Sequence, residues 1–478
     1  MARKLLKIND SSWLFAETSR TPMQVGMLAT FRVPEDRPTF VADLVGRWRG
    51  VRRFESPYNL LFKKLPVPSW VEVADDRIDL DYHLRHSALP APGSQRELGV
   101  LVSRFHSAKM DRRYPLWEVH VIEGLHDEGG ERWALYMKAH HSQVDGVGGI
   151  RLLRRMLSVD PDARDMLPPW AVGTHGPDQS GVPPRESRAV ELVTTPAGSG
   201  GLTELVGTGL RSGAAVAGSL ARTYAETLTG RTDPDRTAPF LAPRSILNGR
   251  IHTPRRFATQ HYPVDRLKSL AKAADSSLND IFMAVCGGAL RRYLDEIGQL
   301  PADSLTANVP VSVRAHEGAR VGNAVTFLFA RLGTDVADPR ARLEAIRAST
   351  RLGKDRLPEV GAVAMDAYTV GLMAPFLSEA LLGIGGRGRP AANVVISNVP
   401  GPSERRYLDG SPMEEIFPVS LLFNGQALNI TAVSYAGEFG IGYTGCRDSI
   451  PSLQRIAVYS GEELQRLEAA YGLAEVPA

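Results

Sequence analysis

The sequence predicts an α/β protein with two halves, on three observations. Short segments with β-strand patterns alternate with amphipathic helical patterns in both parts of the chain. A stretch dense in Gly, Pro, Ser and Thr, residues 173–201, interrupts this alternation, and a helical pattern follows it over 202–228. With 478 residues, the chain has about two to three domain lengths and can bury a substantial core. We therefore expect a first half over residues 1–170, a crossover linker over 171–242 and a second half over 243–478.

The first half contains predicted helices and strands of ordinary length. Residues 38–48 place Phe40, Leu44 and Trp48 largely on one helical face. Asp10, Ser11 or Ser12 is expected to cap a short helix that carries Trp13. Residues 77–84 alternate polar and apolar side chains, which predicts a half-exposed extended segment. Further helices are expected over 97–106 and 150–157, and further strands over 23–31, 70–73, 118–122 and 133–140.

The second half and the linker show the same alternation. Strands are expected over 256–262, 306–313, 324–332 and 393–399, a hairpin over 428–443, and helices over 264–274, 278–297 and 452–471. An apolar face on the 202–228 helix favours a contact within the molecule over a membrane anchor. Residues 359–384 are apolar and weakly charged, but Asp366, Pro375 and Glu379 argue against a simple membrane span. A buried helix pair is the favoured interpretation there, and a lipid-facing or acyl-binding surface is the alternative.

Composition excludes several classes of protein. A net charge of +3, without a dense run of Lys and Arg interleaved with aromatic residues, argues against nucleic-acid binding. Two cysteines, Cys286 and Cys446, cannot form a disulfide framework and suit a reducing compartment. The N-terminus lacks the apolar core of a signal peptide, and no apolar run reaches the roughly 18 residues that span a bilayer. These features predict a cytoplasmic protein.

The most site-like group of side chains follows the predicted strand 133–140. There the chain reads His140-His141-Ser142-Gln143-Val144-Asp145-Gly146. A histidine has an unperturbed pKa of about 6.5, so it can accept a proton near pH 7 and return it. Adjacent strand residues point to opposite faces, so one histidine should face a cleft while the other packs behind it. Asp145 can hold the loop by an ion pair or hydrogen bond, and Gly146 suits a backbone conformation that other residues avoid.

This segment fits the HHxxxDG motif of acyl-CoA-dependent acyltransferases and of peptide-synthetase condensation domains. The wider chain resembles the bacterial wax ester synthase/diacylglycerol acyltransferases. Further matching segments occur in the family's order and span most of the chain: PLW at 115–117, PRSILN at 243–248, LND at 278–280 and NVVISNVPGP at 393–402. HHxxxDG alone is moderately specific, whereas the combination is a strong signal.

The resemblance implies two chloramphenicol-acetyltransferase-like halves, each with a mixed sheet flanked by helices, and an active-site cleft or tunnel between them. It also implies transfer of a long-chain fatty acyl group from acyl-CoA, as co-substrate and without a further cofactor, to diacylglycerol or to a long-chain alcohol. The products would be triacylglycerol or a wax ester. With lipid substrates, a peripheral site at the inner membrane or at lipid bodies is expected for a cytoplasmic protein.

Residue roles follow from the same resemblance. His141 would remove the hydroxyl proton as the oxygen attacks the thioester carbonyl, without a covalent acyl-enzyme. Ser397 is the candidate donor to the oxyanion, and Asp145 joins this catalytic group with Arg314 as one candidate partner.

Supporting and substrate-binding roles are expected elsewhere. His140, Gly146, Asn279 and Asp280 would support the site, although Asn279 or Asp280 could equally well cap a helix. Trp117 is expected to bind substrate, with a plain core residue as the alternative. The family usually has His where this chain has Gln24, which leaves no role for that position.

Two other interpretations remain open, and a third, a metal site, is the least favoured. A related enzyme would use another alcohol or an amine as acceptor. A non-catalytic lipid-binding protein would keep the fold, yet its behaviour would not depend on His141. A metal site is not expected, because adjacent histidines plus Asp145 lack the spacing of a standard zinc motif, and His83 and His86 are interpreted as surface or packing residues.

Overall fold

The computed structural model describes residues 3–6, 8–174, 202–229, 237–313, 324–355, 357 and 362–473. The helices are α1 (Ile8–Ala16), α2 (Phe40–Arg49), α3 (Leu80–His83), α4 (Gln95–Ser107), α5 (Gly146–Met156), α6 (Pro169–Val172), α7 (Leu202–Thr229), α8 (Val264–Ala273), α9 (Leu278–Glu296), α10 (Pro339–Lys354), α11 (Ala362–Leu381) and α12 (Leu453–Ala470). The strands are β1 (Arg3–Leu5), β2 (Gln24–Arg32), β3 (Leu60–Lys63), β4 (Ser69–Glu72), β5 (Leu84–Ala88), β6 (Trp117–Asp127), β7 (Gly130–His140), β8 (Arg255–Pro263), β9 (Thr306–Val313), β10 (Ala324–Arg331), β11 (Val394–Pro400), β12 (Tyr407–Leu408), β13 (Ser411–Val419), β14 (Leu428–Tyr435) and β15 (Glu438–Cys446). The alternation that predicted an α/β protein is confirmed.

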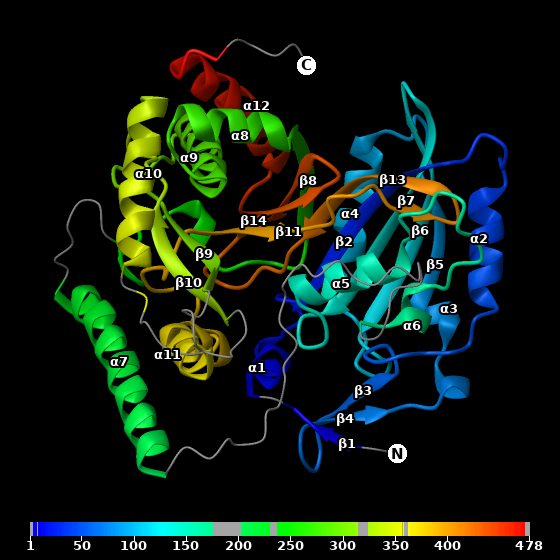
Figure 1. The fold of residues 1–478 in the computed structure, drawn as a ribbon, viewed down its shortest axis with the longest axis horizontal. Coiled ribbons are helices and arrows are strands. Elements are labelled where there is room, and N and C mark those ends of the chain that lie inside the picture. Colours follow the sequence, from blue (N-terminus) through cyan, green and yellow to red (C-terminus); the bar gives the residue numbers. More distant parts are fainter. Residues whose placement is uncertain are drawn as a thin grey trace.

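Two six-stranded sheets form the framework of the molecule and lie side by side (Figure 1). The N-terminal sheet has the order β12-β13-β2-β7-β6-β5, and the C-terminal sheet has the order β10-β9-β11-β14-β15-β8. Both sheets are mixed, because β5 pairs parallel with β6 and β11 pairs parallel with β9 and β14, while the other pairs are antiparallel. A small sheet, β1-β4-β3, lies below the first one. Mixed sheets flanked by helices agree with the expected architecture.

Strand β13 departs from the division expected at residue 243. It belongs to the second half of the sequence, yet it pairs antiparallel with β2, with Ile416 opposite Ala29 and Phe417 opposite Leu28. Strand β12 extends the same sheet beyond it. The two halves therefore do not each keep their own strands, because residues 407–419 complete the N-terminal sheet.

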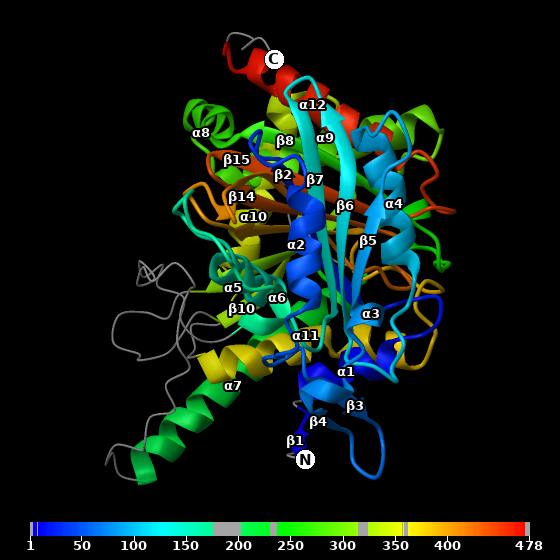
Figure 2. The same cartoon turned by 90° about the vertical axis from the view of Figure 1, so that its right-hand side faces the viewer.

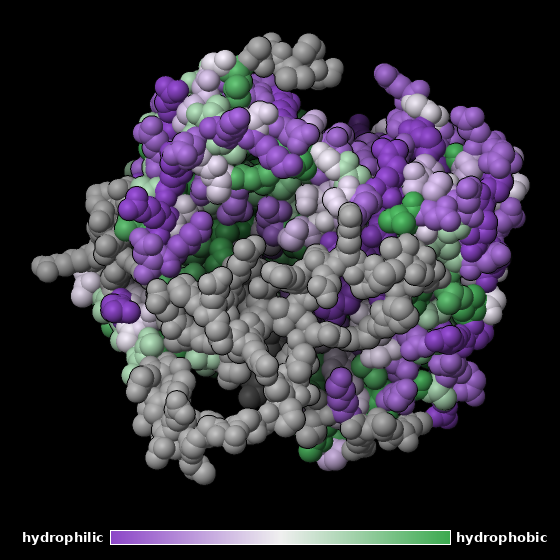
Figure 3. Space-filling view, viewed as in Figure 1, coloured by the Kyte–Doolittle hydropathy of each residue, from purple (hydrophilic) through white to green (hydrophobic). Residues whose placement is uncertain are grey.

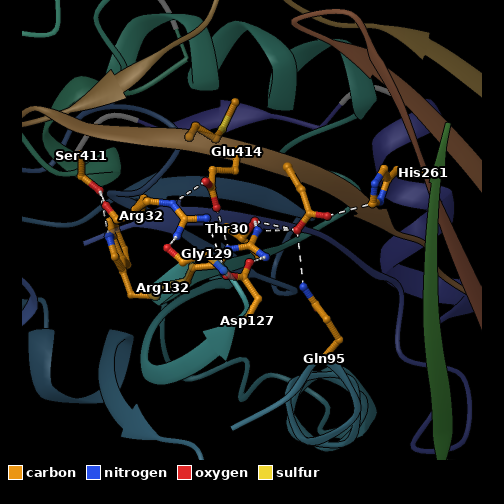
Figure 4. A network of polar contacts seen from close by, with 12 residues as sticks. Thr30, Arg32, Gln95, Asp127, Gly129, Arg132, His261, Ser411 and Glu414 are labelled. Atoms are coloured by element: carbon orange, nitrogen blue, oxygen red, sulfur yellow. Dashed lines mark hydrogen bonds and ion pairs between the residues drawn. The ribbon is translucent and has the colours of Figure 1, made fainter. Parts of the chain in front are cut away.

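Buried and half-buried charges fasten β13 in this position (Figure 4). Arg132 on β7 contacts Glu414 at 2.7 Å and Glu415 at 2.5 Å, and Arg32 on β2 contacts Glu414 at 2.7 Å. The other oxygen of Glu415 lies 3.3 Å from His261 on β8 of the second sheet. Glu414 thus holds β13 to β2 and β7, and Glu415 connects the two sheets, through charge-assisted contacts that are stronger than neutral hydrogen bonds.

The apolar helix faces predicted from the sequence are buried in the hydrophobic core. Helix α2 buries the predicted face, with Trp48 at 1% exposure and Leu44 at 0%. Helix α9 is buried on nearly every side from Asp280 to Leu294 between other helices and the C-terminal sheet. Fully burying a large apolar side chain contributes about 1.5–3 kcal/mol, so both helices are held chiefly by packing.

The linker helix α7 and the apolar helix α11 pack on each other (Figure 2). Leu220 of α7 lies so near Gly371 that a Cβ there would come within 2.6 Å of it. The hydroxyl of Tyr224 donates hydrogen bonds to the carbonyl oxygens of Gly371 and Leu372, at 3.1 and 2.8 Å. The expected contact within the molecule is confirmed for α7. Residues 359–384 were expected to form a buried helix pair, but the described residues there contain one helix, α11, which packs on α7. Residues 175–201, the start of the expected linker, lie outside the described ranges.

Three local expectations are wrong. Residues 77–84 form the end of a 3₁₀ turn and helix α3, because Asp79 caps α3 through the N–H groups of Asp81 and Tyr82. The helix expected over 150–157 begins four residues earlier, since α5 starts at Gly146. Helix α1 begins at Ile8, before the serines expected to cap it.

No helix among the residues described is long and apolar enough to cross a membrane. The space-filling view shows hydrophilic residues over much of the described surface on this side, with hydrophobic residues scattered among them (Figure 3).

Candidate active site

The two histidines lie where β7 ends, near the junction of the two sheets (Figure 1). His140 is the last residue of β7 and pairs with Gln24 of β2. Its backbone N–H donates to the carbonyl oxygen of Leu116 at 2.9 Å, so the Pro115-Leu116-Trp117 segment supports the end of the strand. The backbone N–H of His141 donates to the carbonyl oxygen of Met23, also at 2.9 Å. Both histidine backbones are therefore fixed by neighbouring segments.

His140 is enclosed. It has no exposed surface, and its Nδ1 accepts from the backbone N–H of Ser142 at 3.2 Å and lies 2.7 Å from the Ser142 hydroxyl. In the neutral imidazole, the proton is then on Nε2, which lies 3.7 Å from a carboxylate oxygen of Glu17. Burial lowers the pKa of His140 to about 4, against the opposing effect of Glu17. His140 is therefore neutral near pH 7 and buried away from any substrate.

Glu17 is a buried carboxylate that the sequence did not single out. Its side chain is 2% exposed and is held by Arg112 at 2.8 Å, by Lys109 at 3.1 Å and by the backbone N–H of Met23 at 3.2 Å. A buried carboxylate is tolerated when cations and hydrogen bonds satisfy it. No local pattern marks Glu17, because its partners come from residues that are distant in the sequence.

His141 has a different environment. It follows the end of β7, is half-buried, and stacks on the indole of Trp13 with ring centroids 4.6 Å apart and 10° between the planes. The stacking fixes the plane of the imidazole while part of the side chain stays accessible. The expectation that one histidine packs behind the other is confirmed, with His140 as the packed one.

Asp145 and Gly146 begin helix α5. The Asp145 carboxylate accepts from the backbone N–H of Gly148 at 2.7 Å and is the N-cap of the helix. Asp145 is exposed, so this geometry gives it a capping role that orients the loop 141–145. Gly146 is the first helical residue and does not have the left-handed conformation expected for it. Its Cα instead faces Val399 of β11, since a Cβ there would lie 3.5 Å from Val399 Cγ2.

This contact brings β11 against the histidine loop. Ser397 precedes Val399 by two residues on β11, pairs with Thr431 of β14 and is half-buried. Residues separated by two on a strand share a face, so Ser397 lies on the same face of β11 as Val399. Segments 140–146 and 394–400, far apart in the sequence, therefore lie together at the junction of the two halves.

Trp117 is a core residue, and its expected role in binding substrate is not supported. Its ring is 1% exposed and is stacked by His83 at 4.0 Å, with Phe54, Tyr58 and Trp170 around it. Its indole N–H donates to the carbonyl oxygen of Tyr58 at 2.9 Å. These neighbours occupy the ring, so no face of it is open to a ligand. His83 is the packing residue expected, and burial lowers its pKa to about 4.

Asp280 helps to cap helix α9, which was the alternative to its expected supporting role in the site. It forms a capping box with Ser277, and the hydroxyl of Thr350 on α10 donates to its other oxygen at 2.9 Å. Asn279 precedes it in the first turn and is half-buried. The described contacts of Asp280 all lie within the C-terminal half.

Gln24 is fully buried, and its amide nitrogen donates to the carbonyl oxygens of His106 and Ala108, at 2.6 and 2.9 Å. Arg314, the candidate partner of Asp145, lies outside the described residues. Over the parts of the chain that the structure describes, no group of three or more His, Cys, Asp or Glu could hold a metal ion.

An apolar cluster borders the histidine loop. Its buried members come from α1, the segment before β2, α11 and the loop before β14, and Trp13, whose ring stacks on His141, packs against them. Phe376 of α11 and Phe423 form its centre, with ring centroids 4.4 Å apart. Residues of α11 thus belong to the apolar cluster that Trp13 connects to His141.

Known families and proteins match this chain over nearly its full length. Residues 6–282 match the model of the wax ester synthase/diacylglycerol acyltransferase catalytic domain, and residues 321–468 match the WS/DGAT C-terminal domain. A putative diacylglycerol O-acyltransferase of Mycobacterium tuberculosis is 42% identical over 97% of both chains, and the O-acyltransferase WSD of Acinetobacter baylyi is 36% identical over 96% of both.

Solved structures agree with this assignment. The wax ester synthase/diacylglycerol acyltransferase from Marinobacter aquaeolei superimposes with a TM-score of 0.77 at 35% identity, covering 98% of this chain and 100% of that one. The first condensation domain of the calcium-dependent antibiotic synthetase shares the fold, with a TM-score of 0.56 at 17% identity over 98% of this chain and 96% of its own. The chain therefore belongs to the wax ester synthase/diacylglycerol acyltransferase family.

Proposed function

We infer that this protein is an O-acyltransferase that moves a long-chain fatty acyl group from acyl-CoA to the hydroxyl of diacylglycerol or of a long-chain alcohol. Two of its relatives are named diacylglycerol O-acyltransferase and O-acyltransferase WSD, and each aligns with nearly the whole chain. The observation that carries the proposal is the position of His141, an accessible imidazole fixed by Trp13 beside an apolar cluster. A proton acceptor next to an apolar surface is what an esterification between two lipids requires.

His141 acts as general base in this proposal. The acceptor hydroxyl gives its proton to the imidazole while its oxygen attacks the thioester carbonyl carbon. The tetrahedral intermediate then collapses, the carbon–sulfur bond breaks, and the leaving thiolate takes the proton back from His141. The step needs no metal or redox cofactor, because acyl-CoA brings an activated thioester as co-substrate. His140 cannot replace His141, because it has no exposed surface and a low pKa.

Ser397 is the proposed donor to the oxyanion of this intermediate. Its support is the contact between Val399 of β11 and Gly146 of the histidine loop, which places the face of β11 that carries Ser397 beside the motif. A single well-aimed donor is worth about 2.7–4 kcal/mol of transition-state stabilisation in other acyl-transfer enzymes. Replacing Ser397 with Ala should therefore lower kcat more than it changes KM.

The test of the function is acyl transfer from palmitoyl-CoA, with diacylglycerol and hexadecanol supplied separately. Thiol release that depends on an acceptor, together with the matching ester, is the expected result, and the better acceptor defines the principal product. Ester formation with neither lipid would contradict the proposal. It would favour another alcohol or an amine as acceptor, or a lipid-binding protein without catalysis.

We also propose that the β3–β4 hairpin docks on a lipid surface, where both substrates would be found. The tip of the hairpin reads Lys63-Lys64-Leu65-Pro66-Val67, with Leu65 77% and Val67 53% exposed. Two lysines beside exposed apolar side chains suit an anionic membrane or lipid-body surface, where each lysine contributes about 1 kcal/mol. Helix α1, which carries Trp13, lies at the same end of the molecule (Figures 1 and 2).

Liposome binding tests this second proposal. Replacing both Leu65 and Val67 with Asp should weaken sedimentation with anionic liposomes at least tenfold, since burying each side chain is worth about 1.5–3 kcal/mol. Val458→Asp is the matched control, because Val458 is 55% exposed on α12 at the opposite end of the molecule. Equal binding by both variants would contradict docking through the hairpin.

A further inference from the structure

A pocket of about 260 Å³ opens beside the histidine loop, between segments of the two halves. One part of its lining is apolar and comes from Ala16, Met23 and Phe423, which belong to the cluster next to His141. The other part is polar: Thr18, Ser19, Arg20 and Thr21 come from a loop of the N-terminal half, and Arg250 and Asn424 come from the C-terminal half. The pocket therefore joins an apolar surface to a cationic rim.

The loop that carries Arg20 is pre-organised. The hydroxyl of Thr18 accepts from the backbone N–H groups of Arg20 and Thr21, at 3.2 and 3.1 Å. From the other half, Arg255 donates to the carbonyl oxygen of Arg20 at 3.0 Å, and Thr253 donates to that of Ser19 at 3.2 Å. These bonds use the backbone of the loop and leave the guanidinium of Arg20 at the rim.

No acidic side chain lines this pocket. Glu17 is adjacent in sequence, but its carboxylate is buried and held by Arg112 and Lys109. Within the described parts of the chain, no carboxylate forms an ion pair with Arg20 or Arg250. Arg250 donates to the carbonyl oxygen of Gly383, at 3.2 Å. Two exposed guanidinium groups without a carboxylate, beside hydroxyl groups, form a rim suited to phosphate oxygens.

The rim lies within reach of the proposed base. Met23 lines the pocket, and its carbonyl oxygen accepts from the backbone N–H of His141. Arg20 precedes Met23 by three residues, so their Cα atoms are at most about 11 Å apart. A ligand with an anionic end and a flexible arm can thus occupy the rim while its other end approaches His141.

We propose that Arg20 and Arg250 bind the phosphate groups of acyl-CoA, with the pantetheine arm lying along the apolar side of the pocket toward His141. The proposal rests on the function inferred above and names the subsite that holds the donor. In acyl-CoA the flexible pantetheine arm separates the phosphates from the thioester, so phosphates held at the cationic rim leave the arm free to carry the thioester toward His141.

The test compares binding of palmitoyl-CoA and of palmitoyl-pantetheine, which lacks the phosphates, by titration calorimetry with the full chain. Wild type should bind palmitoyl-CoA more tightly. Arg20→Ala and Arg250→Ala should each weaken that binding about tenfold and leave palmitoyl-pantetheine binding unchanged, because only the phosphates meet the guanidinium groups. Arg104→Ala, at an exposed position of α4 that does not line the pocket, is the control and should bind both compounds like wild type.

Three outcomes would overturn the proposal: unchanged binding of palmitoyl-CoA in both variants, an equal loss for the two compounds, or loss only of binding to anionic liposomes. The last would assign the arginines to lipid headgroups. Because these are binding measurements, they decide the proposal even if wild type forms no ester, a result that would contradict the proposed function alone.

Discussion

Helix α9 of the C-terminal half and strand β7 of the N-terminal sheet are both buried, but with different side chains. From Ile281 to Leu294, the buried residues of α9 carry no charge. On β7, Tyr136, Lys138 and His140 alternate with apolar residues that face the core, so one face of the strand is polar and still buried. Burying such groups costs free energy unless each is paired. The polar face ends at His140. The free-energy cost of burying polar side chains is therefore found on the strand that holds the histidine loop.

The partners of Lys138 lie on strand β6 and at the C-terminal end of helix α4. Its ammonium lies 3.1 Å from the Glu118 carboxylate of β6 and donates to the carbonyl oxygens of Phe105 and Ala108, at 2.9 and 3.0 Å. His120 lies 3.0 Å from the same carboxylate. Each of these charged groups has a partner on the same face. From Ile281 to Leu294 the buried side chains of α9 itself are uncharged, and the buried Arg342–Glu463 ion pair that lies against Gly288 is contributed by α10 and α12.

The largest effect is expected from removing one partner of the buried pair. Glu118→Ala leaves Lys138 charged in the interior and should lower the free energy of unfolding by about 3–5 kcal/mol, measured by denaturant titration. The double variant Glu118→Leu/Lys138→Met removes both charges and should recover most of that loss. If the single variant loses less than the double one, the polar face is not held by this pair.

The second largest effect is expected from lowering the pH, because the buried histidines with lowered pKa values lie in the N-terminal half. Burial lowers the pKa of His106 to about 3 and those of His83 and His140 to about 4, whereas the C-terminal His252 and His261 are more than half exposed. The unfolded chain protonates these side chains near pH 6.5 and the folded one does not, so their stabilising contribution is present above pH 6.5. It falls by about 1.4 kcal/mol per histidine for each pH unit as the pH drops toward 4.

A single substitution checks the assignment of this acid sensitivity. His106→Gln should reduce the slope of unfolding free energy against pH, between pH 6.5 and 4, by the contribution of one histidine, about 1.4 kcal/mol per pH unit. His126→Gln, at an exposed position of β6, should leave the slope unchanged. A slope that is equal in all three proteins would show that buried histidines do not cause the acid sensitivity.

The smallest effect concerns Asp145, which caps α5 in the structure. Asp145→Ala should lower the free energy of unfolding by about 1 kcal/mol, while Asp145→Asn, which keeps a good capping side chain, should stay near wild type in stability and in acyl transfer. Loss of activity in the Asn variant at full stability would show that the carboxylate charge, and with it a catalytic role, matters.

Local patterns predicted most of the secondary structure, because a helical or strand face buries the residues that its period brings together. The face of α2 and the hairpin β14–β15 are examples. Strand β13 was not predicted, because Pro412, Glu414 and Glu415 interrupt the alternation of polar and apolar residues that is typical of a strand. Its partners, Arg32 and Arg132, lie almost 400 and 300 positions away along the chain, and only the folded structure brings them near.

The site shows the same limit. The motif marked His140 and His141, but neither residue type nor spacing could select Trp13 or Glu17, whose roles depend on contacts with distant segments. Trp117 appeared open to substrate in the sequence because its surrounding rings are contributed by residues 54, 58, 83 and 170. Asp145 could have been assigned as a cap, since Asp before the first turn of a helix is a known signal.

The most direct measurement compares His141→Ala with wild type for acceptor-dependent thiol release from palmitoyl-CoA, together with the unfolding midpoint of each. We predict that His141→Ala folds with near-wild-type stability and loses about 10²–10⁴-fold in kcat, the usual contribution of general base catalysis. Activity close to wild type in the folded His141→Ala variant would contradict the assignment of this histidine as the base.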